Sequence, residues 1–348
     1  MVKQKEIINS FVQLGSLMIS LGNQSEWGGF DTGVTEKEYA KLQSTIDRQV
    51  NYNGWFTPEN VRKSLLAIGE RLNLEELSQW SSGYSYTDTP KNIGIIMAGN
   101  IPLVGFHDFL STIISGNNAT CKLSSDDKYL LPLLSESLFE FLPGLQERIC
   151  FSDGYIGKVD AVIATGSDNS SAYFNQYFGK YPHIFRKNRS SLAVLTGSES
   201  KDDLEKLGAD IFSYYGLGCR SVSHLLLPNG FDLDKFFEGI FSYGDVINNN
   251  KYGNNYDYNK AVFLLNQEQL LDNNFVLIRE SEELSSPIAM LHYHYYENNK
   301  DIDAYLDSNK GSIQIVVGKN HVPFGQAQCP QLDDYADGVD VMKWLEEL

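Results

Sequence analysis

Cysteine is scarce in this sequence, because the 348 residues contain only four. The four thiols are Cys121, Cys150, Cys219 and Cys329, and none of them has the Cys-x-x-Cys or Cys/His spacing of a zinc site. Their wide separation also excludes the dense disulfide framework of a small secreted protein. We therefore expect reduced thiols, no bound metal and a cytoplasmic protein.

Basic residues and long apolar runs are also in short supply. Lys and Arg number 28 against 45 Asp and Glu, which gives a net charge of -17. Nucleic-acid binding requires concentrated Lys and Arg, so this composition argues against a nucleic-acid partner. No stretch approaches the roughly 18 consecutive apolar residues of a membrane helix, and residues 1–22 lack the apolar segment of a signal peptide. We expect no membrane span.

What is present is an alternation of short apolar strands with helical segments. The first 90 residues read as helices, and a length of 348 residues favours two domains. The alternation that follows predicts parallel sheets in an α/β protein. The predicted strands are 92–97, 119–123, 148–151 and 159–165, and then, in a fresh series, 191–196, 223–228, 275–280, 287–296 and 312–318. Residues 244–259 read as a polar insertion, and the chain has neither a Walker A motif nor a Gly-x-Gly-x-x-Gly fingerprint.

Cys219 lies in a Gly-Leu-Gly-Cys turn between a predicted helix and a predicted strand. A lone cysteine is most often a small buried residue, but Gly216 and Gly218 allow the backbone angles that expose a thiol near backbone amides. His224 follows five residues later, and roughly 16 Å of strand separates it from the thiol. From the residues alone, both a nucleophile and a core cysteine remain open.

Two other features have both a functional and an ordinary interpretation. The turn Gly-Asn-Ile-Pro at 99–102 follows a predicted strand, where α/β sheets bind ligands, so Asn100 either points into a site or simply forms a turn. His292 and His294 share one face of a strand, but no third ligand has suitable spacing. We expect these histidines to pack in the core.

Six stretches, in chain order, resemble the aldehyde dehydrogenase superfamily and, within it, the LuxC-type acyl-CoA reductases. The resemblance runs from about residue 90 to residue 330. The stretches are NIGIIMAGNIP (92–102), ISGNNATCKLSSDD (114–127), VDAVIATGSD (159–168), GLGC (216–219), EELSSP (282–287) and PFGQAQ (323–328). The resemblance implies an aldehyde dehydrogenase-like α/β fold, with a Rossmann-like cofactor domain and an α/β catalytic domain.

The resemblance also implies a set of site residues. Cys219 would be the nucleophile and Asn100 a donor to the oxyanion. The residues implied at the cofactor are Lys122, Ser124, Ser125, Thr165, Gly166, Ser167 and Glu283, of which Lys122 and Glu283 would contact the ribose groups.

Two departures from the superfamily pattern refine the expected activity. Hydrolytic members have a glutamate that activates water, whereas here the corresponding stretch begins with Arg186. An acyl-cysteine without that base survives long enough to be reduced or transferred. Ser125 stands where NAD-preferring relatives often have a glutamate, and the absence of this carboxylate allows the 2′-phosphate of NADPH.

These observations predict an NADPH-dependent reductase that converts an acyl-CoA thioester to an aldehyde through an acyl-cysteine. The alternatives are an acyl transferase or thioesterase that uses the same acyl-cysteine, and a scaffold without activity. We expect a cofactor domain over 1–189, a catalytic domain over 190–320, and a segment over 321–348 that packs back on the cofactor domain. A homo-oligomer and an acyl-transferring partner protein are both compatible with this hypothesis.

Overall fold

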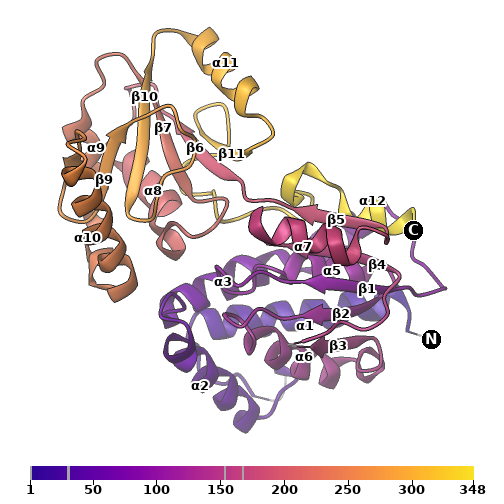
Figure 1. Cartoon of the computed structure of the whole chain (residues 1–348). Helices are drawn as coiled ribbons and strands as arrows, with labels where there is room; N and C mark the ends of the chain where they lie inside the picture. The colour runs from indigo at the N-terminus through magenta and orange to yellow at the C-terminus, as the bar shows by residue number, and fades with distance from the viewer. Residues whose placement is uncertain (1, 30–31, 153, 167) are drawn as a thin grey trace. The chain divides into compact units, whose positions relative to one another are not determined.

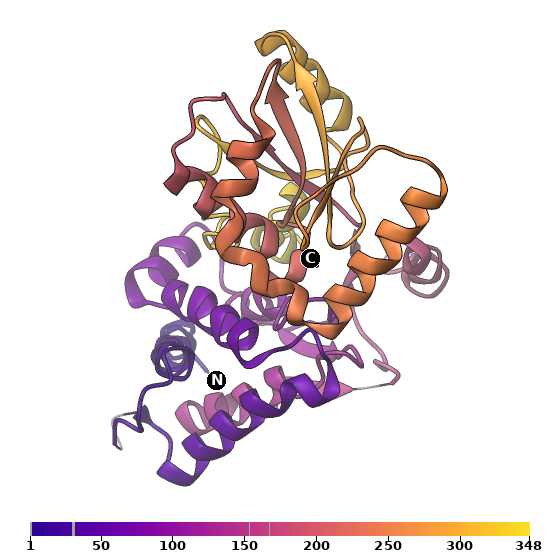
Figure 2. The same cartoon turned by 90° about the vertical axis from the view of Figure 1, so that its left-hand side faces the viewer.

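The computed structural model describes residues 2–29, 32–152, 154–166 and 168–348. The chain divides into two compact units, shown from two sides in Figures 1 and 2. Unit 1 comprises Met1–Lys187 and Gln331–Leu348, and unit 2 comprises Asn188–Pro330. Both units are α/β, as the sequence predicts.

Unit 1 is built on a five-stranded parallel sheet with the order β3-β2-β1-β4-β5. Its strands are β1 (Asn92–Ile96), β2 (Asn118–Lys122), β3 (Ile149–Ser152), β4 (Ala161–Thr165) and β5 (His183–Arg186). Its helices are α1 (Gln4–Gly22), α2 (Glu36–Tyr52), α3 (Pro58–Arg71), α4 (Leu74–Ser81), α5 (Phe106–Ile114), α6 (Leu130–Phe141), α7 (Asp168–Phe178) and α12 (Val341–Glu346).

The two faces of this sheet bury different helices. Successive strand side chains point to opposite faces, so Ile93 and Ile95 of β1 join the main core while Ile96 faces the other side. The main core also contains buried side chains from α1 to α6 and from the C-terminal segment. On the opposite face, Phe174 and Phe178 of α7 pack against Ile96 and its neighbours in β4.

Unit 2 contains a six-stranded sheet with the order β11-β6-β7-β10-β9-β8, parallel except for the β8–β9 pair. Its strands are β6 (Ser190–Val194), β7 (Val222–Pro228), β8 (Leu271–Asp272), β9 (Leu277–Glu280), β10 (Met290–Tyr296) and β11 (Ile313–Gly318). Its α-helices are α8 (Lys201–Phe212), α9 (Leu233–Gly239), α10 (Asn250–Leu265) and α11 (Asn299–Asn309). Side chains of α8 and α9 cover one face, and Ile302, Tyr305 and Leu306 of α11 cover the other.

The polar insertion predicted over 244–259 is a helix for most of its length. Helix α10, orange in Figure 2, begins after Asn249, whose side chain accepts from the backbone N–H groups of Lys251 and Tyr252. Its buried residues are Tyr252, Tyr256 and Asn259. These positions are four and three residues apart, which is the spacing of one helix face.

Residues 321–330 belong to unit 2, whereas the sequence assigned them to the C-terminal segment. The reason is a buried carboxylate, because Asp210 accepts from the backbone N–H groups of Gly325 at 2.7 Å and Ala327 at 2.9 Å. In addition, Arg220 Nε donates to the carbonyl oxygen of Ala327 at 2.5 Å.

Within the residues that the structure describes, no helix is long and apolar enough to cross a membrane.

Candidate active site

Cys219 lies in a tight turn between η3 (Ser213–Gly216) and β7, and its side chain is exposed. The N–H of Ser221 donates to the carbonyl oxygen of Gly218 at 2.9 Å and closes the turn. From β6, Ser191 Oγ donates to the carbonyl oxygen of Cys219 itself at 2.8 Å. The thiol is therefore carried on a backbone that is fixed from the neighbouring strand.

The chain enters this turn through three consecutive left-handed residues. Tyr214, Tyr215 and Gly216 have φ values of 53°, 58° and 76°. Only glycine adopts this region without a steric cost, so the two tyrosines store backbone strain next to the cysteine. This run follows the end of α8 at Phe212 and leads the chain into the turn that carries the exposed Cys219.

The unit 1 candidates gather at the carboxyl ends of three adjacent strands. Strand β1 pairs with β2 on one side and with β4 on the other, and all three run parallel. Asn100 follows β1, Lys122 ends β2 and Thr165 ends β4. The strand order reverses between β1 and β4, and this switch point is where open parallel sheets bind nucleotides.

The turns after β1 and β2 touch each other. A Cβ atom on Gly99 would lie 2.5 Å from Ser124 Oγ, so a glycine is required there for the close approach. Asp127 then ties the two turns together, because its Oδ2 accepts from the backbone N–H of Leu103 at 2.7 Å. Burial raises the pKa of Asp127 to about 6. Asn100 and Ser124 are therefore held on neighbouring loops.

The remaining unit 1 candidates differ in exposure. Ser125 and Asn100 are exposed, whereas Lys122, Ser124, Thr165 and Gly166 are half-buried. Ser167 lies outside the described residues.

Arg186, in the position of the missing glutamate, is a core residue of unit 1. Its Nη2 donates to Asp108 Oδ1 on α5 at 2.7 Å, and both side chains are buried. The residue thus supplies no carboxylate and forms a buried ion pair instead.

Glu283, in unit 2, has an exposed side chain on a connection whose backbone is tightly held. The Nδ1 atoms of His224 and His292 each lie 2.9 Å from the carbonyl oxygen of Glu283. A carbonyl oxygen only accepts, so both rings carry their proton on Nδ1. His224 Nε2 must then accept from His294 Nδ1, 2.8 Å away.

Burial disfavours a positive charge on this histidine cluster. Burial lowers the pKa of His224 to about 3 and also lowers the pKa values of His292 and His294. Both ring nitrogens of His224 are engaged, one by the Glu283 carbonyl oxygen and the other by His294. The sequence predicts packing for His292 and His294 but gives no sign of the shared Glu283 carbonyl.

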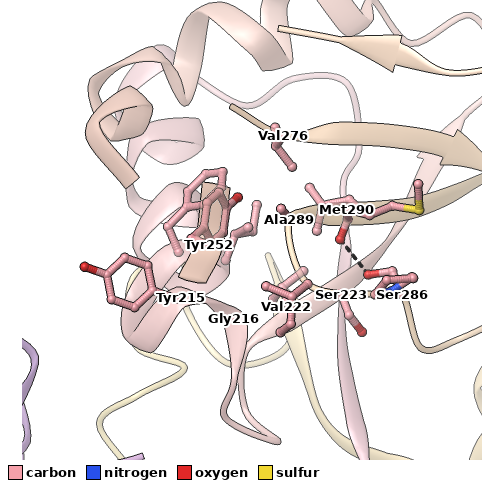
Figure 3. A pocket seen from close by; sticks show the side chains of 14 residues that line it. Tyr215, Gly216, Val222, Ser223, Tyr252, Val276, Ser286, Ala289 and Met290 are labelled. Atoms are coloured by element: carbon pink, nitrogen blue, oxygen red, sulfur yellow. Dashed lines mark hydrogen bonds between the residues drawn. The ribbon is translucent and has the colours of Figure 1, made fainter. Parts of the chain in front are cut away.

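Unit 2 also contains a small cavity of about 30 Å³ beside the cysteine turn. Figure 3 shows Tyr215, Gly216, Tyr252 and Met290 around it, with a hydrogen bond from Ser286 Oγ to the carbonyl oxygen of Met290. The cavity is far smaller than the pockets that bind ligands, so it does not hold the substrate as the structure stands.

Among the described side chains, no group of three or more His, Cys, Asp or Glu residues could hold a metal ion. Nor does any of the four thiols form a disulfide within that part of the chain.

Comparison with known proteins agrees with the family resemblance noted in the sequence. A family model described as acyl-CoA reductase (LuxC) matches residues 33–236, which is more than half of the chain. No curated protein matches.

Solved aldehyde dehydrogenases share the fold at low sequence identity. A mutant of aldehyde dehydrogenase C from Pseudomonas syringae, in complex with NAD+ and octanal, is 11% identical with a TM-score of 0.61, and the match covers 90% of this chain and 72% of that one. Aldehyde dehydrogenase KauB from Pseudomonas aeruginosa is 12% identical, with a TM-score of 0.59 and coverages of 91% and 72%. The NAD+ complex of an aldehyde dehydrogenase from Bacillus cereus is 10% identical, with a TM-score of 0.58 and coverages of 91% and 72%. The aldehyde dehydrogenase-like fold predicted from the sequence is therefore confirmed.

Proposed function

The chain belongs to the LuxC family of acyl-CoA reductases, and from this premise we propose that it reduces acyl-CoA thioesters with NADPH through an acyl intermediate on Cys219. The observation that carries the proposal is the exposed thiol on a turn fixed by Ser191. An exposed thiol in such a turn can reach a thioester, whereas a buried structural cysteine cannot.

Cys219 performs the first half of the reaction. Its thiolate attacks the thioester carbonyl, the bond to the CoA sulfur breaks, and CoA leaves as a thiolate. Asn100 donates to the oxyanion of the tetrahedral intermediate, a contribution commonly worth ~3 kcal/mol. The product of this half-reaction is an acyl-cysteine.

The second half of the reaction requires a bound nicotinamide. NADPH, when bound, supplies the hydride that reduces the acyl group. The residues proposed to hold this cofactor are Lys122, Ser124, Ser125, Thr165, Gly166, Ser167 and Glu283. Collapse of the thiohemiacetal on Cys219 then breaks the carbon–sulfur bond, releases the aldehyde and regenerates the thiolate.

The fit of unit 1 to a dinucleotide rests on the switch point between β1 and β4. The closely packed turns at Gly99 and Ser124 leave Ser125 exposed and bring no glutamate to that position. At position 125 itself a 2′-phosphate would therefore meet a hydroxyl, and the nearest carboxylate in the sequence is that of the exposed Asp126. This is the argument for NADPH over NADH.

The proposal is tested with a series of saturated acyl-CoAs. We expect mass spectrometry without NADPH to find the acyl adduct on Cys219, and aldehyde formation to have a higher kcat/KM with NADPH than with NADH. Cys219→Ala should abolish both adduct and aldehyde, while the control Cys329→Ala, a half-buried thiol of the same unit, should keep them.

Three outcomes would contradict parts of the proposal. An adduct on another cysteine would overturn the role of Cys219. CoA release that never leads to NADPH or NADH oxidation would favour the acyl transferase or thioesterase. A clear preference for NADH would show that position 125 does not decide the cofactor.

A further inference from the structure

The connection between β9 and β10 is held by side chains at three successive carbonyl groups. Tyr305 Oη donates to the carbonyl oxygen of Glu282 at 2.9 Å, and Ser223 Oγ donates to that of Leu284 at 3.1 Å. Between them, the carbonyl oxygen of Glu283 accepts from both His224 and His292. The donors come from α11, β7 and β10, so the connection is anchored to a rigid part of unit 2.

The Glu283 carbonyl oxygen accepts two side-chain hydrogen bonds, whereas the Glu282 and Leu284 carbonyl oxygens accept one each. It has two lone pairs, and the two histidine N–H groups use both. Rotation of this peptide plane would break two hydrogen bonds at once and leave buried donors without partners. The direction in which the Glu283 side chain leaves the backbone is thereby fixed.

Packing alone does not account for histidine at these positions. His224 and His292 are 0% and 1% exposed, on a sheet face that also carries Leu226 and is covered by α11. His292 Nε2 is buried and has no hydrogen-bond partner among the described residues. A leucine would avoid the cost of burying these polar atoms, so the two Nδ1–H donors are what distinguishes histidine here.

We propose that His224 and His292 are positioning residues for the nicotinamide cofactor, because they lock the backbone from which the Glu283 carboxylate projects. The proposal rests on the proposed function, in which Glu283 contacts the nicotinamide ribose. The histidines themselves touch neither substrate nor cofactor.

The two half-reactions separate positioning from general stability. Formation of the acyl-cysteine needs no nicotinamide, so a displaced Glu283 leaves it unchanged. Reduction of the acyl-cysteine needs the nicotinamide in place, and a misplacement of about 1 Å can cost up to about 10²-fold in rate. A variant that merely loosens the fold would slow both half-reactions.

The experiment compares His292→Leu, which removes the donor, with His292→Asn, whose amide N–H lies near the position of Nδ1. Each full-length variant is assayed for the burst of CoA released without NADPH and for the KM and kcat of aldehyde formation. For His292→Leu we expect an unchanged burst and an increase of about tenfold or more in the KM for NADPH. His292→Asn should restore most of the wild-type KM. Tyr305→Phe removes only the hydroxyl that donates to the carbonyl oxygen of Glu282. It should shift the KM for NADPH in the same direction, and it replaces His292→Leu in the test if that variant does not fold.

A double-mutant cycle with Glu283→Gln shows whether the effect passes through Glu283. We expect His292→Leu to add little to the KM change caused by Glu283→Gln. Fully additive effects, equal losses in both half-reactions, or an unchanged KM in His292→Leu and Tyr305→Phe would overturn the proposal. A wild-type protein that releases no CoA would instead overturn the proposed function, and the positioning role with it.

Discussion

The Arg186–Asp108 ion pair decides what position 186 does in this protein. The two side chains are only 8% and 3% exposed and lie 2.7 Å apart. Removing one partner of such a pair leaves an uncompensated charge in the core. At the scale of the residue, Arg186 is part of the stability of unit 1.

Arg186→Glu would place two carboxylates together in that core. We expect the substitution to lower the free energy of unfolding by about 3–5 kcal/mol and not to create thioester hydrolysis. All four tryptophans lie in unit 1, so their fluorescence during denaturant unfolding reports on this unit. The matched control is Lys187→Glu, which makes the same charge change at an exposed neighbour. A stable Arg186→Glu protein that hydrolyses the acyl-cysteine would show that the side chain reaches the thioester after all.

Single residues also show how far the sequence predicts the candidate site. The glycines at 216 and 218 indicate a turn at Cys219, and Gly216 does adopt a left-handed φ of 76°, a preference that is local to the backbone. The contact of His224 and His292 with Glu283 depends on which strands become neighbours, and spacing along the chain contains no such information. The Asp108 partner of Arg186 was unpredictable for the same reason.

At the scale of elements, strands β7 and β10 bring three histidines to one face of a sheet. His224 and His292 are directly opposite in the parallel register, and His294 is two residues further along β10. Burial holds the pKa values of all three below the usual value. This part of unit 2 is consequently sensitive to acid.

For His224 the sign of the pH dependence follows from its pKa of about 3 in the folded protein. The unfolded chain takes up the proton first as the pH falls below about 6.5, so stability is lost between there and pH 3, at up to about 1.4 kcal/mol per pH unit. Between pH 6.5 and 5 we expect His224 to contribute a loss of about 2 kcal/mol. Hydrogen exchange of the β7 and β10 amides should show this loss, and His224→Asn should reduce it.

The comparison with His224→Asn is needed because other groups titrate in the same interval. The pKa of Asp127 is raised to about 6, so its ionisation destabilises unit 1 as the pH rises through 6, which is the opposite direction. If wild type and His224→Asn have the same pH dependence, His224 is not held neutral by the fold.

Elements also differ in how well the sequence predicts them. Strands β1, β4 and β7 are predictable from their apolar sequences, because they lie inside their sheets and are buried on both faces. Strand β5 was not predicted, since an edge strand of four residues alternates between exposed and buried positions. Most of helix α10 reads as a polar insertion in the sequence because its buried face consists of tyrosine and asparagine.

At the scale of the whole chain, unit 1 includes the C-terminal residues Gln331–Leu348, which follow unit 2 in the sequence. The yellow C-terminal segment in Figure 1 returns to unit 1, where Tyr335 Oη accepts from Trp80 Nε1 at 2.8 Å and lies 2.8 Å from Tyr84 Oη. Tyr84 in turn donates to Asp340. These contacts join segments that are about 250 positions apart in the sequence.

Tyr335→Phe tests the strength of this connection. The buried N–H of Trp80 would lose its acceptor, so we expect the free energy of unfolding of unit 1 to fall by about 1–3 kcal/mol. Tryptophan fluorescence during denaturant unfolding measures the loss. Tyr155→Phe is the control, because Tyr155 is 84% exposed in the same unit. Equal stability of the two variants would mean that the Tyr335 hydroxyl is replaced by water.

The division of the chain also sets an order of events on the ribosome. Domains generally fold as they emerge during synthesis, and residues 2–187 emerge first, without the segment that carries Tyr335. Unit 2 is then made in full while Trp80 and Tyr84 still lack these partners. That part of unit 1 stays incomplete until the segment with Tyr335 has been made, so the unit that starts to fold first is completed after unit 2.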